Sequence, residues 1–254
     1  MVQSSGGEPS IHSQIIPMLR ASKERGIAHV MLNTNGKRIA HDDHFLQQLA
    51  ELRPSIYFQF DGFDTETYGA IHGNPDILPE ELRSLDRLAM IDCDVVLVPA
   101  IEQGVNQLEA GRMVRFALEH PAVRGINFRP AWNAGRHGPH DPLQRQTIPA
   151  VLGFIEEQTD GLFTVVDFVP VPCCFPTRNS VTYAYVGEGG VTVLPRILNV
   201  DDYLDYITNR DLPDLGQELK TAAQSAWLGP AALPEWSGRW SVRLACAVTG
   251  YTAW

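Results

Sequence analysis

The chain has 254 residues, which is enough to bury one substantial core, and βα barrels of this size often form a single domain. Its 20 basic and 30 acidic residues give a formal net charge of -10, which argues against the basic surface that nucleic-acid binding needs. No apolar run reaches the ~20 residues of a membrane span, and no signal peptide is visible, so the sequence predicts a cytoplasmic protein.

Helical and strand patterns alternate along most of the chain. Apolar residues at helical spacing predict a helix from Ser10 to Arg25, followed by a buried strand from Ile27 to Leu32. Asp42 or Asp43 opens the next helix, and Arg53-Pro54 ends it. The elements predicted beyond it are a strand at Ser55–Phe60, a helical turn at Thr65–Tyr68, a helix at Leu78–Met90, a strand at Asp94–Ile101, a helix at Gln107–Glu119, a strand at Val123–Phe128, a helix at Thr147–Gln158 and a strand at Phe163–Phe168.

This alternation indicates an α/β fold with a parallel sheet. With Val2 to Ser5 counted as a strand, about six strands predict an open, partial βα (TIM-like) barrel over residues 1–186. Beyond Gly187 the pattern breaks, which predicts a small, irregular C-terminal extension over residues 187–254. Its expected elements are an edge strand at Val191–Leu194, helices at Val200–Asn209 and Pro213–Trp227, and either a strand pair or a disordered tail at Arg239–Trp254.

A short glycine motif, Ser5-Gly6-Gly7-Glu8-Pro9, follows the first predicted strand. The two glycines lack Cβ, so the backbone can turn sharply and a ligand can approach it closely. Glu8 then stands at the carboxyl end of the strand, where α/β folds place their ligand sites, and a carboxylate there suits an ammonium group. Pro9 and Ser10 can start the next helix. An ordinary glycine-rich turn is the alternative interpretation.

Polar residues also follow the later strands. They are Thr34 and Asn35, Gln59 and Asp61, and Glu102. Because strand ends on one side of a βα barrel converge on one mouth, we expect these side chains to lie at the same rim as Glu8. Asn-Gly and Asp-Gly are also plain turn signals, and Glu102 suits a helix N-terminus equally well. Glu109 is predicted to face solvent from the outer side of its helix.

In this order the motifs resemble the radical S-adenosylmethionine (radical SAM) superfamily, over roughly Val2 to Val186. In that family a Gly-Gly-Glu-Pro motif ends the second strand and holds the methionyl amino group of the cofactor. Within the family, the chain is similar to the branch of the archaeal tetraether-lipid synthases and the pterin-type methyltransferases. Three segments carry this closer similarity: Tyr57-Phe58-Gln59-Phe60-Asp61-Gly62-Phe63-Asp64, Val98-Pro99-Ala100-Ile101-Glu102-Gln103-Gly104-Val105-Asn106 and Pro172-Cys173-Cys174.

The resemblance implies an iron-sulfur enzyme that uses S-adenosylmethionine and a 4Fe-4S cluster for radical chemistry on a small molecule, either a lipid or a pterin-like compound. It also implies a reductant protein such as ferredoxin or flavodoxin as a partner. No catalytic side chain is assigned, because the cofactor and the cluster carry the hard step. The implied cofactor-binding residues are Gly6, Gly7, Glu8, Pro9, Thr34, Asn35, Gln59, Asp61 and Glu102.

The chain departs from the family at its start. The family's Cys-x3-Cys-x2-Cys loop stands upstream of Gly-Gly-Glu-Pro, but only Met1 to Ser4 precede the motif here. The first strand, the cluster loop and the first helix are therefore expected to be missing. Two interpretations stay open: a fragment of a radical SAM enzyme, or a catalytically silent barrel that binds S-adenosylmethionine or another small molecule without a cluster.

The four cysteines do not form a disulfide framework in this interpretation. Cys173 and Cys174 are candidate ligands of an auxiliary cluster, because the similar branch is rich in cysteine at this point. Two adjacent thiols cannot complete such a site, and Arg178 stands where a third cysteine is expected, so two structural cysteines are an equal alternative. Cys93 is predicted to lie in the core.

A hydrolytic βα-barrel enzyme is a hypothesis from another class. It would use Glu8, Asp61 and Glu102 as carboxylates, together with histidine ligands for a metal at the strand ends. His29 falls inside a predicted strand and His41 after one, which is poor support for such a site. His137 and His140 lie in a long loop, for which solvated side chains are the favoured interpretation.

Overall fold

A computed structural model describes residues 1–131, 145–170, 179–187, 189–197 and 242–249 of the chain. These ranges form one sheet with the strand order β1-β2-β3-β4-β6-β10-β8-β7, in which β5 also pairs with β6 and β9 with β8. The strands are β1 Val2–Ser4, β2 Val30–Thr34, β3 Ser55–Gln59, β4 Val95–Val98, β5 Ala100–Ile101, β6 Val123–Pro130, β7 Val169–Pro170, β8 Asn179–Gly187, β9 Gly190–Val193 and β10 Val242–Thr249.

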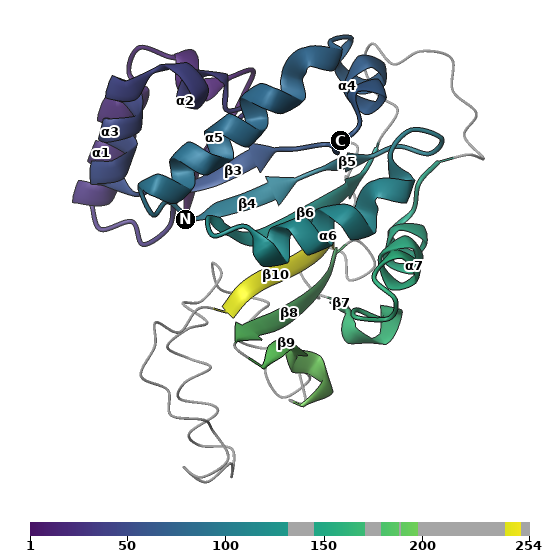
Figure 1. Ribbon diagram of the computed structural model, residues 1–254. Helices are drawn as coiled ribbons and strands as arrows, with labels where there is room; N and C mark the ends of the chain where they lie inside the picture. Colours follow the sequence, from purple (N-terminus) through teal and green to yellow (C-terminus); the bar gives the residue numbers. More distant parts are fainter. Residues whose placement is uncertain (132–144, 171–178, 188, 198–241, 250–254) are drawn as a thin grey trace, which may run out of the picture.

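Helices connect the parallel strands and pack on the sheet. α5 and α6 lie across β3, β4 and β6 (Figure 1). None of the described helices is long and apolar enough to cross a membrane. The α-helices are α1 Ile15–Glu24, α2 Lys37–His41, α3 Asp43–Leu52, α4 Thr65–His72, α5 Leu78–Met90, α6 Ala110–Glu119 and α7 Ile148–Gln158, and the short 3-10 turns include η1 Pro9–Ile11, η3 Gln107–Glu109, η5 Val165–Asp167 and η6 Leu194–Arg196.

The pairing confirms the predicted α/β class with its open parallel sheet. β1, β2, β3, β4 and β6 pair as parallel neighbours, so their carboxyl ends lie along one edge. Alternate residues of these strands, such as Leu32, Phe58 and Leu97, are fully buried in one apolar core with the inner faces of the helices. Burial of a side chain of this size stabilises the fold by about 1.5–3 kcal/mol, so the core holds the carboxyl edge rigidly in place.

The predicted strand at Phe163–Phe168 is wrong. Thr164 and Asp167 form a capping box there, which closes the 3-10 turn η5. The guanidinium of Arg196 then holds both carboxylate oxygens of Asp167, at 2.8 and 2.6 Å. Since the side chains satisfy the local backbone, the segment turns instead of pairing, and the place beside β6 belongs to β10.

The last part of the chain contributes one strand to this sheet. β10 pairs in parallel with β6 and antiparallel with β8. The sequence predicts either a strand pair or a disordered tail for Arg239–Trp254, and the residues of this range that the structure describes form a single strand. β8, which the sequence did not predict, pairs with β9 close to the predicted edge strand at Val191–Leu194. The domain boundary near residue 187 stays a prediction, and β10 from beyond it lies inside the sheet.

Two helix predictions also need correction near the start. The first helix begins at Ile15, not Ser10, because Glu8 caps the separate turn η1 through the backbone N–H of Ser10. A helix that the sequence did not predict, α2, precedes α3, while Asp42 caps α3 as expected by accepting from the N–H of Phe45. The helices predicted at Val200–Asn209 and Pro213–Trp227 lie outside the described residues, as do His137 and His140.

Candidate functional site

The Glu8 carboxylate is fixed at the edge formed by β1 and β2. Its Oε1 accepts hydrogen bonds from the Thr34 hydroxyl at 2.7 Å and from the Ser10 backbone N–H at 3.0 Å. Its Oε2 accepts from the backbone N–H of Asn35 at 2.8 Å. A carboxylate has about four lone-pair sites, so these three bonds orient the group and leave acceptor capacity for a further donor.

Free space adjoins the glycine pair. A Cβ built on Gly6 or on Gly7 would meet no atom of the described residues within 4 Å, and Gly6 has φ +143. Pro9 follows as the first residue of η1, and the buried hydroxyl of Ser10, the next residue, has no hydrogen-bond partner within the described part of the chain. The room beside the backbone and the fixed carboxylate of Glu8 together fit an ammonium-bearing ligand.

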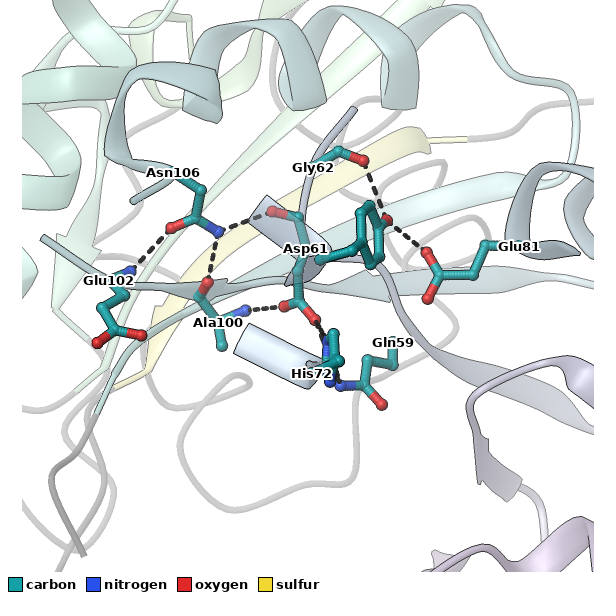
Figure 2. A network of polar contacts seen from close by, with 9 residues as sticks. Gln59, Asp61, Gly62, His72, Glu81, Ala100, Glu102 and Asn106 are labelled. Carbon is teal, nitrogen blue, oxygen red and sulfur yellow. Dashed lines mark hydrogen bonds and ion pairs between the residues drawn. The ribbon is translucent and has the colours of Figure 1, made fainter. Parts of the chain in front are cut away.

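A second polar group forms where β3 ends (Figure 2). Asp61 is fully buried, and its Oδ1 accepts from the backbone N–H of Ala100 at 2.6 Å. Its Oδ2 lies 2.7 Å from His72 Nε2 and 3.3 Å from Gln59 Nε2. The carboxylate predicted to line a cofactor pocket is thus enclosed, and its neighbours Gln59 and His72 are the partly exposed groups.

Asn106 connects this group to Glu102. Its side-chain amide donates to the carbonyl oxygens of Asp61 and Ala100, at 2.7 and 2.8 Å. Its amide oxygen accepts from the backbone N–H of Glu102 at 2.9 Å. Asn106 is fully buried, so it binds the ends of β3 and β5 together and holds the Glu102 backbone beside them.

Glu81 is a buried acid that contacts the Tyr68 hydroxyl. The Tyr68 hydroxyl donates toward Glu81 Oε2 at 2.5 Å and toward the Gly62 carbonyl at 3.0 Å. Burial, with the negative charge of Asp61 added, raises the pKa of Glu81 to about 8. Burial and the proximity of Glu81 also raise the pKa of Tyr68. The Tyr68 hydroxyl has one proton but faces two acceptor oxygens. A protonated Glu81 supplies a second proton, so each of the two contacts contains a hydrogen when both side chains are neutral.

The predicted exposure of Glu109 is wrong. Its carboxylate is buried and accepts from the Phe63 backbone N–H at 2.5 Å and from the Thr67 hydroxyl at 2.7 Å. The residue precedes α6 in the 3-10 turn η3, whose three residues per turn change the direction in which the side chain points. Glu109 thereby holds the segment that leads from β3 into α4.

The described cysteines do not fit a cluster site. Cys93 and Cys246 are both buried, and burial raises the pKa of Cys93 to about 11 and also raises that of Cys246. A cluster needs thiolates, which such environments disfavour. Within the described ranges, no group of three or more His, Cys, Asp or Glu side chains is placed to hold a metal ion. Cys173 and Cys174 lie outside the described residues.

The structure thus brings the candidate residues into two hydrogen-bonded groups at the carboxyl edge. Glu8, Thr34 and Asn35 form one, and Gln59, Asp61 and the backbone of Glu102 belong to the other. Sequence reasoning missed His72 and Asn106 as members of the second. Asn106 stands inside one of the segments that carry the family resemblance, which is an available signal, whereas His72 lies beyond the helical turn predicted at Thr65–Tyr68.

Comparison with known proteins gives a close relative. No family model matches the chain. It is 33% identical over 234 residues to a 7,8-dihydro-6-hydroxymethylpterin dimethyltransferase of Methanocaldococcus jannaschii, an alignment that covers 82% of this chain and 46% of the relative. The chain therefore spans about half the length of that protein.

A solved structure is also similar. It is a domain of pyruvate-formate lyase-activating enzyme from Bacteroides vulgatus, which is 20% identical with a TM-score of 0.49, over 64% of this chain and 95% of that one. The motifs at Gly6–Glu8 and Tyr57–Asp64 indicate the same kind of protein as the relative from Methanocaldococcus jannaschii. The chain is thus similar to a pterin dimethyltransferase, in agreement with the resemblance of its motifs to the radical S-adenosylmethionine superfamily.

Proposed function

We propose that this chain is the cofactor-binding part of a radical SAM enzyme and that it holds S-adenosylmethionine at the carboxyl edge of its sheet. One observation carries the proposal, namely the Glu8 carboxylate, which three donors fix beside the open space at Gly6 and Gly7. A hydrogen bond from an ammonium group to a carboxylate is about twice as strong as one between neutral groups. Glu8 is therefore the group that would bind the amino end of the cofactor.

The other candidate residues support this site in different ways. Thr34 and Asn35 orient Glu8 and need no direct contact with the cofactor. Gln59 stands where β3 ends, together with the buried Asp61, and would contact a more distant part of the same ligand. The backbone N–H of Glu102 donates to the Asn106 side chain beside this group, and we propose the Glu102 side chain as a contact for either the cofactor or the substrate.

The chemistry that the family's 4Fe-4S cluster supplies with S-adenosylmethionine is hydrogen abstraction from unactivated carbon. Neither described cysteine fits such a cluster, since Cys93 and Cys246 are buried in the core. We therefore propose that the ligands of the cluster come from outside the described part of this chain. What the described residues contribute is the binding and orientation of the cofactor.

A second candidate function is a barrel that binds S-adenosylmethionine or another small molecule without a cluster. The observation in its favour is the environment of the described cysteines, because Cys93 and Cys246 are buried and do not suit a cluster. The rim described above would then bind its ligand and carry out no radical chemistry.

The substrate of the radical enzyme is proposed to be a small molecule. A pterin-like compound follows from the relation to the Methanocaldococcus jannaschii methyltransferase, and a lipid from the wider branch that the sequence resembles. By the same family analogy, we propose a reductant protein such as ferredoxin or flavodoxin as the electron donor.

Two measurements on the parent protein separate these functions. Calorimetric titration with S-adenosylmethionine tests the shared claim of cofactor binding. Anaerobic reconstitution with iron and sulfide, followed by iron analysis and electron paramagnetic resonance, tests the cluster. Binding together with a stoichiometric cluster supports the radical enzyme, and binding without iron supports the cluster-less barrel. If S-adenosylmethionine does not bind, the radical enzyme is wrong, and the cluster-less barrel is left only as a protein that binds another small molecule.

A further inference from the structure

His72 is a functional candidate that lies outside all the motifs of the sequence. It is the last residue of α4, and Gly73 ends that helix in the left-handed conformation, with φ 68. The helix begins shortly after β3 and returns its final side chain to the end of the same strand. There the imidazole Nε2 lies 2.7 Å from Asp61 Oδ2 (Figure 2).

The contact with Asp61 determines which ring nitrogen carries the proton. A nitrogen and a carboxylate oxygen at 2.7 Å need a hydrogen between them, and Nε2–H supplies it. In the neutral ring, Nδ1 is then the hydrogen-bond acceptor, on the other side of the imidazole. A carboxylate that fixes the tautomer and orientation of an imidazole in this way is a recurrent arrangement at functional sites.

The Gln59 side chain is oriented by its position next to Asp61 and His72. Its side-chain nitrogen lies 3.3 Å from Asp61 Oδ2 and 3.3 Å from His72 Nε2. Because the amide nitrogen points at these groups, the amide oxygen points away from them (Figure 2). The end of β3 therefore directs one acceptor from Gln59 and one from His72 away from the buried carboxylate.

Exposure decides which member of the His72–Asp61 pair a ligand can reach. The His72 side chain is 22% exposed, whereas that of Asp61 is 0% exposed. Both oxygens of Asp61 are already engaged, Oδ1 by the Ala100 N–H and Oδ2 by His72 and Gln59. The carboxylate is thus committed to holding its neighbours, and the imidazole is the accessible group.

We propose that His72 contacts the ligand at this edge, with Nδ1 accepting a hydrogen bond from a neutral O–H or N–H group, and that Asp61 is its positioning residue. This inference rests on the proposed function. The donor would come either from the ribose hydroxyls or the adenine amino group of S-adenosylmethionine, or from the ring N–H groups of a pterin-like substrate. The chemistry is the same in both cases, and the experiment below distinguishes the two sources.

Nitrogen-15 NMR of the histidine side chains tests the geometry directly in the parent protein, at a pH where the ring is neutral. The expected result is protonated Nε2 and unprotonated Nδ1 for His72, and a mixture of both tautomers in Asp61→Asn. Addition of the correct ligand should move the Nδ1 resonance upfield, as expected for an acceptor that gains a hydrogen bond. The ligands used are S-adenosylmethionine and 6-hydroxymethyl-7,8-dihydropterin, each alone and then together.

Binding measurements on variants supply the second test. His72→Phe removes the acceptor and should weaken binding of the contacted ligand about three- to tenfold, leaving the other ligand unchanged. His72→Gln keeps a donor for Asp61 and an acceptor for the ligand, so it should restore most of the affinity. His120→Gln is the matched control, because this largely buried histidine, paired with Asp86 at 3.7 Å, precedes β6 at the opposite edge.

The outcomes separate this inference from the proposed function. If the parent protein binds neither ligand, the proposed function is wrong and the role of His72 is wrong with it. If the parent binds a ligand while the Nδ1 resonance stays in place, or if Nδ1 carries the proton in the free protein, only the inference about His72 is overturned. If the role of His72 is purely structural, the Nδ1 resonance should stay in place when a ligand binds, and His72→Phe should lower the stability without changing the affinity.

Discussion

The Thr34 hydroxyl donates a 2.7 Å hydrogen bond to Oε1 of Glu8, which ties the end of β2 to the residue that follows β1. Thr34 is itself buried, and its oxygen also accepts from the backbone N–H of Gly36 at 3.2 Å. The carboxylate is therefore positioned before any ligand arrives. A group that needs no reordering on binding contributes more of its interaction energy to affinity.

Glu8→Gln is expected to weaken the binding of S-adenosylmethionine about tenfold to hundredfold. The change removes the negative charge that would meet the ammonium group, and a hydrogen bond to a charged group is worth roughly 1.5–3 kcal/mol. Glu119→Gln is the matched control, because Glu119 is exposed at the end of α6, away from this edge. Calorimetric titration of the parent, Glu8→Gln and Glu119→Gln with S-adenosylmethionine measures the three affinities. Equal affinities would show that Glu8 does not contact the cofactor.

Thr34→Val should have a smaller effect on the same affinity, about threefold to tenfold. It removes one of the donors that orient Glu8 and leaves the charge in place, which is a loss of roughly 1 kcal/mol. In combination with Glu8→Gln the two changes should be less than additive, because they act through one contact. Full additivity in this double-mutant cycle would show that Thr34 does not act through Glu8.

The alternation of helices and strands was predictable because its signals are local. Apolar spacing, the cap at Asp42 and the break at Pro54 lie within a few residues of the elements they define. Parallel order then follows from the alternation, and with it the shared edge that holds Glu8, Thr34 and Asp61. This much of the candidate site follows from the sequence.

Contacts between distant segments were not predictable in this way. β10 pairs with β6, which lies more than a hundred residues earlier in the chain. The short apolar sequence of β10 does not indicate which strand it pairs with. His72 reaches Asp61 only because α4 ends where it does. Glu109 faces inward since a 3-10 turn precedes α6, and the sequence pattern does not distinguish that turn from the first turn of the helix.

Stability should fall as the pH rises toward and through the pKa of Glu81. That pKa is raised from 4.5 to about 8 in the folded protein, so the folded state binds more protons than the unfolded state between these values. The stabilisation is complete below about pH 4.5 and is lost as the pH passes about 8. Each pKa unit corresponds to about 1.4 kcal/mol, which makes the change measurable.

Urea denaturation from about pH 5 to about pH 9 gives the measurement. Glu81→Gln stays neutral and keeps a partner for the Tyr68 hydroxyl, so its stability should change less over this range than that of the parent. Glu119→Gln is the control and should follow the parent. If Glu81→Gln loses stability with pH as steeply as the parent, Glu81 is not the titrating group.

Gly62→Ala should destabilise the fold by about 2 kcal/mol or more, through strain and overpacking. Gly62 has φ +154, and a Cβ added there would lie 2.5 Å from Glu109 Oε1 and 2.8 Å from its Cδ. The Glu109 carboxylate cannot move away without loss, because it holds the Phe63 N–H and the Thr67 hydroxyl. Denaturant unfolding measures the change.

Gly69→Ala is the matched control for this substitution. Gly69 lies inside α4, seven residues further along the chain, and a Cβ there would meet none of the described atoms within 4 Å. Alanine in a helix interior is favoured over glycine by roughly 0.5–1 kcal/mol, so this variant should gain stability while Gly62→Ala loses it. Equal and small effects in both variants would mean that Glu109 does not pack against Gly62, and the connection from β3 into α4 would then need another explanation.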